Sequence, residues 1–309
     1  MVALQHVLPK KLLTLLAGAF ARREAGGVTT AVIRRFIARY GVAMDEAENP
    51  DPAAYKSFND FFTRALKPGV RPFSDADFLC PVDGAISQLG PIAGHAGDVI
   101  YQAKGHTYST TALVGGDVAL AKKFEHGQFA TIYLSPKDYH RIHMPCDGEL
   151  RRMIYVPGKL YSVNPATARA VPGLFAINER VVCVFDTPHG PFVNVLVGAT
   201  IVGSMATVWH GVVNPRDREG KIPQHGEYKV ERAAQVCHVT PPNEPPYLEL
   251  REWDYKPGEV VLKKGDEMGR FLLGSTVVML WPRDTIRFTE SWKPAGSVRM
   301  GEAMGVRAA

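Results

Sequence analysis

The sequence is poor in cysteine and has no long apolar run near its start. Its four cysteines, Cys80, Cys146, Cys183 and Cys237, are widely separated, and no two form a Cys-x-x-Cys pair. In a chain of 309 residues this spacing does not indicate a disulfide framework and suits a reducing compartment. The longest apolar run near the start, residues 12–21, is half of the roughly 20 residues that a membrane-spanning helix needs. This run therefore cannot cross a bilayer as a helix.

Two common signature motifs are also missing. The chain contains no G-x-G-x-x-G and no series of alternating strands and helices, which excludes a doubly wound dinucleotide-binding sheet. It contains no G-x-S-x-G, the serine turn of the usual hydrolases. With 46% hydrophobic and 22% charged residues, the composition is that of an ordinary globular protein.

Acidic residues are almost absent from the first forty positions. Residues 1–40 contain seven basic residues and one acidic residue, Glu24, for a net charge of +6, whereas the whole chain carries +5. The remaining 269 residues therefore sum to −1. A general nucleic-acid-binding protein carries its basic face on the folded body, so we expect no nucleic-acid partner.

The basic residues at the start alternate with apolar residues at helical spacing. Residues 12–21 form the first apolar segment, and a second segment places Val32, Ile33, Phe36, Ile37 and Tyr40 on one face between three arginines. Two consecutive basic amphipathic helices suit a protein that lies on an anionic membrane surface. A helical cap with a solvated basic face is the alternative interpretation, and a signal peptide is a second one.

After the helical start, the pattern changes to strands. Ser57 and Asp60 form a capping-box pattern that predicts a short helix with Phe58, Phe61 and Phe62 on its apolar face. From about residue 70, apolar and β-branched runs separated by Asp-Gly and Pro-Gly turns predict strands at 85–89, 99–103, 129–134, 150–156, 180–186, 193–200, 204–208, 260–262 and 276–280. Residues 211–258, rich in proline and charge, are expected to be irregular.

The predicted fold class is therefore α+β and predominantly β. N-terminal amphipathic helices are followed by a β-barrel or sandwich core that resembles the barrel-sandwich hybrid folds. We expect residues 1–66 to form a helical, membrane-associating region and residues 67–309 to form the catalytic β domain.

One apolar stretch, residues 269–280, has a feature that bears on chemistry. It reads as two buried strand segments that meet at Gly274-Ser275. A glycine in such a position often marks a tight bend, and the serine places a hydroxyl next to the Gly274 carbonyl. If a base removed the serine proton, that oxygen could attack its own backbone and replace the peptide bond by an ester. Taken alone, a Gly-Ser pair is more often an ordinary bend in a sheet.

The surroundings of this pair resemble the self-cleavage site of the phosphatidylserine decarboxylases, in particular the short bacterial form. The resemblance rests on Leu273-Gly274-Ser275-Thr276 and the preceding residues 264–271. It extends in the same order to the segments 58–62, 81–88, 139–145 and 174–180. Such a series of motifs over most of the chain is far more specific than any one of them.

The resemblance implies a mechanism and a set of residues. It assigns Asp83, His143 and Ser275 to a triad that acts on the chain's own backbone and breaks the Gly274–Ser275 bond. Chains of residues 1–274 and 275–309 would result and stay together as a heterodimer, with Ser275 converted into a covalent pyruvoyl cofactor and no metal required. The pyruvoyl would form a Schiff base with phosphatidylserine and release CO2 to give phosphatidylethanolamine.

The second histidine of the same loop, His140, is expected to serve decarboxylation rather than cleavage. It titrates in a useful range and lies three residues from His143. The enzyme would be peripheral on the cytoplasmic face of the cell membrane. The oligomeric state of the cleaved pair stays open.

Three alternative functions remain at this point. One keeps the pyruvoyl but takes a soluble amino acid as substrate, which leaves the basic amphipathic start unexplained. Another is a metal-dependent peptidase with zinc held by Asp83, His140 and His143, although their spacing is no established zinc signature. The last is a carrier domain without enzymatic activity, suggested by the fold resemblance alone.

Overall fold

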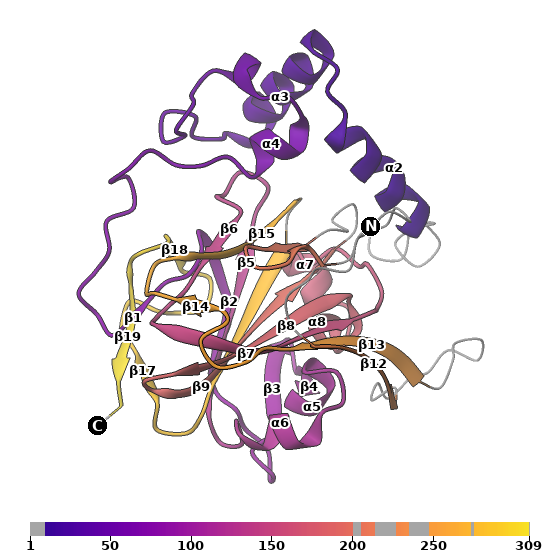
Figure 1. Cartoon of the computed structure of the whole chain (residues 1–309). Helices are drawn as coiled ribbons and strands as arrows, with labels where there is room; N and C mark the ends of the chain where they lie inside the picture. The colour runs from indigo at the N-terminus through magenta and orange to yellow at the C-terminus, as the bar shows by residue number, and fades with distance from the viewer. Residues whose placement is uncertain (1–9, 200–204, 214–226, 235–246, 273–274, 309) are drawn as a thin grey trace.

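We analysed a computed structural model of the chain, in which residues 10–199, 205–213, 227–234, 247–272 and 275–308 are described. The side chains of residues 10–15, 227–234, 247 and 248 are excluded from the description. The chain begins with helices and continues mainly as strands (Figure 1). The predicted α+β, predominantly β class is confirmed.

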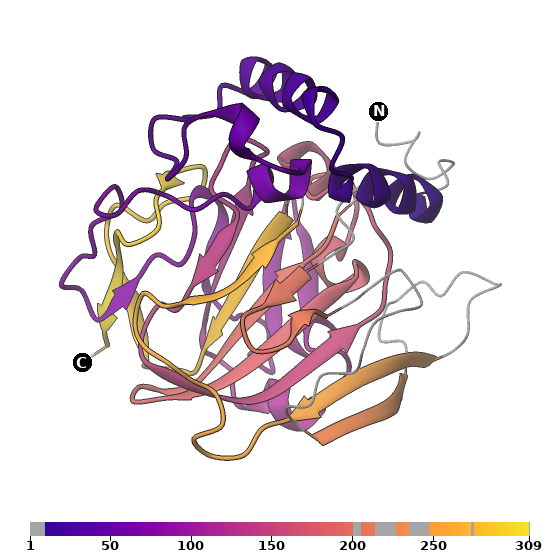
Figure 2. The same cartoon turned by 45° about the horizontal axis from the view of Figure 1, so that its top comes forward.

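The helical N-terminal part consists of α2 (Lys10–Arg22), α3 (Gly27–Tyr40), the 3-10 turn η1 (Pro52–Ala54) and α4 (Phe58–Phe62). Helix α4 begins where the capping pattern predicted, because the Ser57 side chain accepts a hydrogen bond of 3.1 Å from the Asp60 backbone N–H. The three α-helices lie together at one end of the molecule (Figures 1 and 2). Helices α3 and α4 contact each other through aromatic rings, in which Phe36 meets Phe58, Phe61 and Phe62, and Ala21 of α2 belongs to the same buried cluster.

The largest sheet is antiparallel and has the strand order β12-β13-β7-β8-β9-β16-β5-β2-β18, with β14 paired to β7. Its strands are β2 (Gly84–Pro91), β5 (Gln128–Leu134), β7 (Gly148–Val156), β8 (Arg180–Thr187), β9 (Gly190–Val197), β12 (Glu227–Ala234), β13 (Tyr247–Asp254), β14 (Val261–Leu262), β16 (Ser275–Trp281) and β18 (Ser297–Val298). Within the described ranges this sheet is an open path. The layered sandwich of the prediction is thus present, whereas a closed barrel is not.

Both faces of the large sheet are covered. Along β16, Val277, Met279 and Trp281 belong to one buried cluster, and Val278 and Leu280 belong to the other. Burial on both faces explains why this stretch is a continuous apolar run rather than an alternating one.

Smaller sheets cover the first face of the large sheet. One has the order β11-β10-β15-β6 and another the order β1-β19-β17. Their strands are β1 (Phe78–Leu79), β6 (Arg141–His143), β10 (Met205–Thr207), β11 (Gly211–Val212), β15 (Glu267–Phe271), β17 (Ile286–Phe288) and β19 (Ala303–Arg307).

Short helices and a hairpin cover the second face. The hairpin joins β3 (Val99–Ala103) and β4 (His106–Ser109). The helices are α5 (Thr110–Leu113), α6 (Val118–Lys122), α7 (Pro165–Ala168) and α8 (Leu174–Ile177). Helices α5 and α6 lie at the end of the molecule opposite to α3 and α4 (Figure 1).

The structure corrects one sequence expectation and adds detail to another. Residues 211–258 are not irregular throughout, because β12 and β13 pair over eight residues each and β13 continues the sheet from β7. The strands on either side of Gly274-Ser275 lie in different sheets, since β15 pairs with β6 and β10, and β16 pairs with β5 and β9. Leu273 and Gly274 lie outside the described residues.

Candidate active site

The sheet topology gathers the predicted site residues at one end of β5. Strands β2 and β16 both run antiparallel to β5, one on each side. Ser275 is the register partner of Leu134, and Ala85 and Thr276 are both partners of Tyr133. The N-terminal ends of β2 and β16 therefore lie where β5 ends. The loop of residues 135–140 begins at the same place, so Asp83, Ser275 and His140 are brought to one edge.

Gly84 allows β2 to approach β5 closely at this edge. A Cβ atom at position 84 would lie 2.5 Å from the Tyr133 carbonyl oxygen, closer than real Cβ contacts come. Only glycine fits without a shift of backbone. This close approach fixes the position of Asp83, which immediately precedes the strand.

Ser275 is the first residue of β16 and is fully buried. Its Oγ has no hydrogen-bond partner among the described residues. A buried hydroxyl is normally paired, and one that is not requires an explanation such as a catalytic role. The serine is thus buried and unpartnered among the described residues, at the start of a strand that lies in a different sheet from β15.

His140 is also fully buried, and its two ring nitrogens differ in environment. Nδ1 lies 2.8 Å from the Asp138 carbonyl oxygen, so it is the protonated nitrogen that donates. Nε2 therefore carries the lone pair, and it has no partner within the described part of the chain. The ring of Phe62 covers the imidazole at a centroid distance of 4.0 Å. Burial lowers the pKa of His140 to about 3, which keeps the ring neutral at pH 7.

The backbone connects His140 to the segment that carries Ser275. The carbonyl oxygen of His140 accepts a hydrogen bond of 3.0 Å from the backbone N–H of Phe271, four residues before Ser275. The adjoining strands β6 and β15 then pair from Arg141 to His143. His143 is therefore farther from the Ser275 end of this ladder than His140 is.

His143 has partners at both ring nitrogens. Nδ1 lies 2.8 Å from the Gly265 carbonyl oxygen and donates to it, and Nε2 lies 3.1 Å from the hydroxyl of Tyr139. The backbone N–H of His143 donates to Pro81, two residues before Asp83, so the two predicted triad members are neighbours. Burial lowers the pKa of His143, and the charge of Asp83 opposes this effect.

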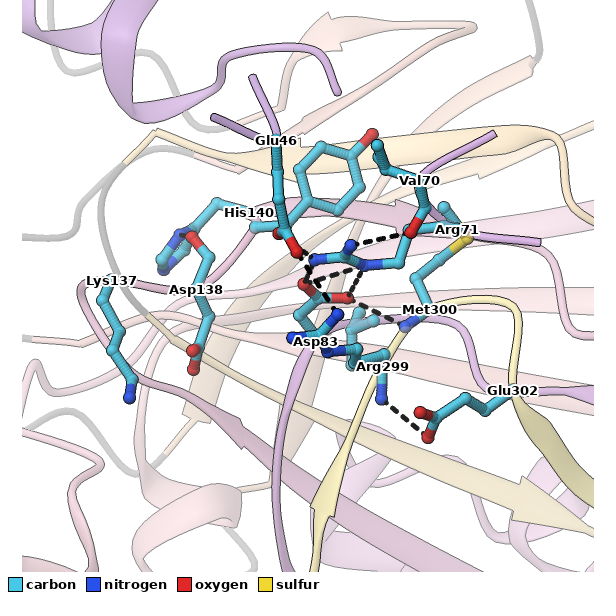
Figure 3. A network of polar contacts seen from close by, with 12 residues as sticks. Glu46, Val70, Arg71, Asp83, Lys137, Asp138, His140, Arg299, Met300 and Glu302 are labelled. Carbon is cyan, nitrogen blue, oxygen red and sulfur yellow. Dashed lines mark hydrogen bonds and ion pairs between the residues drawn. The ribbon is translucent and has the colours of Figure 1, made fainter. Parts of the chain in front are cut away.

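The Asp83 carboxylate is held by an arginine that the sequence did not single out (Figure 3). Arg71 donates to it from Nε at 3.0 Å and from Nη2 at 2.5 Å, and the backbone N–H of Met300 donates to it at 2.8 Å. Arg71 also pairs with Glu46 at 2.7 Å. The hydrogen bond between Asp83 and His143 that a triad requires is not formed in this structure, so the triad stays a prediction.

The cofactor and metal expectations can be compared with this arrangement. The cofactor expected from the sequence derives from the serine itself, and a free buried hydroxyl at a strand start fits that origin. Among the described residues, no group of three or more His, Cys, Asp or Glu side chains is placed to hold a metal ion. Three cysteines, Cys80, Cys146 and Cys183, are free and buried, and Cys237 lies outside the description.

Sequence reasoning missed Phe62, Arg64, Arg71 and Tyr139 as site residues. Phe62 and Arg64 lie at the end of α4, and Arg141 Nε donates to the Thr63 carbonyl between them at 2.8 Å. The only sequence signal was that the segments 58–62 and 139–145 both carry motifs of the resemblance. That they pack against each other follows from the fold.

Comparison with known proteins places the chain in a family. A family model described as phosphatidylserine decarboxylase matches residues 58–306, and a second, described as PSD, matches residues 1–41. Phosphatidylserine decarboxylase proenzymes from Azoarcus sp. and Variovorax paradoxus are each 62% identical to it; the alignments cover 97% of this chain and 93% and 95% of those proteins. The proenzyme from Dechloromonas aromatica is 61% identical over 98% of this chain and 96% of that protein. The chain belongs to the phosphatidylserine decarboxylase family, a family of carboxy-lyases.

Proposed function

We propose that this chain is a proenzyme that cleaves itself between Gly274 and Ser275 and then decarboxylates phosphatidylserine to phosphatidylethanolamine. The observation that carries the proposal is the Ser275 hydroxyl, which is buried, unpartnered among the described residues and located where β16 begins. The family relationship supports the substrate and the term proenzyme.

The cleavage uses only groups of the chain. A base takes the proton of the Ser275 hydroxyl. The serine oxygen then attacks the carbonyl carbon of Gly274 and displaces the backbone nitrogen of Ser275, which gives an ester. Elimination then breaks the bond between the serine oxygen and Cβ, which frees the carboxylate of Gly274 and leaves a dehydroalanine at position 275. Tautomerisation and hydrolysis release ammonia and leave the pyruvoyl group. Chains of residues 1–274 and 275–309 result.

We assign the base to His143, supported by Asp83. The Nε2 atom of His143 faces a phenol hydroxyl, which can rotate about its C–O bond. Asp83 would have to exchange one of its Arg71 bonds for the imidazole. His140 is less suitable as the base, because a pKa of about 3 is far from the operating pH at which a general base works best.

His140 has the properties of a group that serves the second reaction. The pyruvoyl group, once formed, supplies an electron sink for loss of CO2 from the serine headgroup. The chain must then bind the headgroup, exclude water and return a proton to the α-carbon. The neutral imidazole of His140 offers an Nε2 lone pair that is unpartnered among the described residues, so it can accept a hydrogen bond from the headgroup and would carry a proton only in passing.

The N-terminal helices are proposed to hold the site at an anionic membrane surface, peripherally on the cytoplasmic face. Leu16 and Phe20 of α2 are 60% and 50% exposed, and Val28 of α3 is 61% exposed. Exposed arginines lie beside them at positions 22, 23, 34, 35 and 39. No helix in the described part of the chain is long and apolar enough to cross a membrane. We therefore assign residues 1–66 to membrane association and residues 67–309 to catalysis.

The cleavage proposal is tested on a denaturing gel with mass spectrometry of both products. Purified protein should give chains of residues 1–274 and 275–309, and the smaller chain should resist Edman degradation because its N-terminus is a ketone. Ser275→Ala should stay intact and inactive. Intact wild-type protein that still decarboxylates phosphatidylserine would overturn the proposal.

The membrane proposal is tested by sedimentation with phosphatidylserine-containing vesicles. Burial of one large apolar side chain is worth about 1.5–3 kcal/mol, so Phe20→Ser should weaken partitioning by about 10-fold or more. Val118→Ser is the control, because Val118 is an apolar residue that is 60% exposed, against 50% for Phe20, but lies on α6, at the opposite end from α3 and α4. Equal losses in the two variants would contradict a specific membrane face on α2.

A further inference from the structure

Arg64 is a buried cation beside the candidate site that has no counter-ion in the described part of the chain. The residue is 5% exposed, and the described salt bridges do not include it. Among the described residues its guanidinium forms one hydrogen bond, from Nη2 to the Lys137 carbonyl oxygen at 3.1 Å. Its Nε is buried and unpartnered among the described residues. Buried guanidinium groups are normally paired with an anion, so this one is unusual.

Contacts on both sides place Arg64 next to His140. Lys137, its hydrogen-bond acceptor, lies in the same loop as Asp138 and His140. Phe62, two residues before Arg64, covers the His140 ring. The charge of Arg64 is also near enough to contribute to the low pKa of His140, after burial. An anion bound to Arg64 would thus lie beside the imidazole.

The carboxylates nearest to Arg64 are already in use. Asp83 and Glu46 both pair with Arg71. The Asp138 carboxylate accepts the backbone N–H of Ser135 at 2.6 Å. Burial raises the pKa of Asp138, so its charge is disfavoured as well. Asp83, Asp138 and Glu46 act on Arg64 only through their charge, and none of them forms a described ion pair with it, so its guanidinium can still pair with an anion from outside these groups.

We propose that Arg64 binds the phosphodiester of the lipid headgroup and positions the serine moiety at His140 and residue 275. This inference rests on the proposed decarboxylase function and names a specificity residue for it. The headgroup offers two anions, a carboxylate and a phosphodiester. A guanidinium paired with the carboxylate would stabilise the ground state that must lose its charge as CO2, which opposes the reaction. The phosphodiester keeps its charge from substrate to product, and arginine forms two-pronged contacts with phosphate oxygens.

The choice between the two anions gives a sharp experiment. Phosphatidylethanolamine retains the phosphodiester but lacks the carboxylate. With short-chain soluble lipids, Arg64→Met should raise the KM for phosphatidylserine by about 10- to 100-fold, as expected for loss of a charged hydrogen bond. It should raise the inhibition constant of short-chain phosphatidylethanolamine by a similar factor. Self-cleavage, scored separately on a gel, should be retained.

A chemical variant of the substrate completes the test. A phosphatidylserine whose phosphate is methylated to a neutral triester should bind the wild type about 10- to 100-fold more weakly than the diester. Arg64→Met should discriminate little between the two, because the interacting pair is already broken. Arg151→Met is the matched control, since Arg151 lies on β7 and pairs with Glu149 and Asp186. Arg151→Met should bind the triester more weakly than the diester by the same factor as the wild type.

Each other outcome overturns the inference. A higher KM with an unchanged inhibition constant for phosphatidylethanolamine would assign Arg64 to the carboxylate. If Arg64→Met binds both lipids as the wild type does but has a lower kcat, Arg64 acts in the structure or the chemistry of the site and not in binding of the headgroup. Arg64→Lys keeps the charge but not the planar guanidinium. If Arg64→Met fails to fold or to cleave, the KM for phosphatidylserine and the inhibition constant of phosphatidylethanolamine are measured for Arg64→Lys instead. A wild type that neither cleaves nor decarboxylates would instead refute the proposed function.

Discussion

The backbone N–H of Met300 donates a hydrogen bond of 2.8 Å to the carboxylate of Asp83. The two residues are on opposite sides of the proposed cleavage bond, so this contact joins the future small chain to the future large chain. It lies beside the ion pair of Asp83 and Arg71. The candidate triad residue is therefore also part of the contact between the two chains.

The first prediction is that the two chains stay together after cleavage. Strand β16 lies between β5 and β9 and is buried along its whole length, so its removal would expose both faces of the core. Cleaved protein should elute as one species in native size-exclusion chromatography and separate only in denaturant. Loss of residues 275–309 from the native peak would contradict this arrangement.

The second prediction concerns Arg71. Arg71→Met leaves Asp83 without its ion-pair partner and Glu46 with Arg299 alone, and breaking a buried ion pair in this way costs about 3–5 kcal/mol. We expect lower stability in urea and slower cleavage at a temperature where the variant is still folded. Arg71→Lys should rescue cleavage in part.

Arg151→Met serves as the control for Arg71, because its pairs are more exposed and contribute about 1 kcal/mol or less. If Arg71→Met cleaves at the wild-type rate in the folded state, Arg71 does not position Asp83 for the reaction.

The third prediction separates the two histidines. His143→Ala and Asp83→Ala should accumulate uncleaved precursor, since each removes part of the proposed base. His140→Ala should still cleave, wholly or in part, but decarboxylate about 10²–10⁴-fold more slowly, the usual contribution of a general acid–base group. Cleavage is read from a gel and decarboxylation from released CO2. A complete block of cleavage in His140→Ala would make His140, with its free Nε2, the base of maturation.

The fourth prediction is a pH dependence of stability that arises from His140. Its pKa is about 3 in the folded chain and 6.5 in the unfolded chain, because burial disfavours the charged form. Between these pH values the unfolded state binds a proton that the folded state does not, so the stability falls as the pH falls through this window. One proton corresponds to about 1.4 kcal/mol per pH unit.

This dependence is measured by urea unfolding of the uncleaved Ser275→Ala protein between pH 7 and pH 4. Adding His140→Gln should reduce the slope of stability against pH by about 1.4 kcal/mol per unit. His143 and His210, whose pKa values are also lowered by burial, remain in both proteins and cancel in the comparison. Equal slopes would show that His140 is accessible to protons in the folded state.

Local patterns in the sequence were sufficient for several elements. The spacing of apolar residues predicted the N-terminal helices, and the Ser57 cap predicted the start of α4. Runs of β-branched residues predicted most strands of the large sheet. They succeeded because helix and strand periodicity is a property of neighbouring residues. The β12–β13 pair was missed because its strands are rich in charge and lack the apolar runs of the central strands.

The partners within the site were decided by the tertiary structure alone. Motifs in the sequence singled out Asp83, His140, His143 and Ser275, but not that Arg71 holds Asp83 or that Phe62 buries His140. Nor did they show that Arg64 has no counter-ion among the residues that the structure describes. Arg71 and Asp83 are 12 residues apart in the chain, and Met300, which also holds Asp83, is 217 residues from it. These contacts depend on which strands flank β5 and on where α4 packs, and no local periodicity specifies that order.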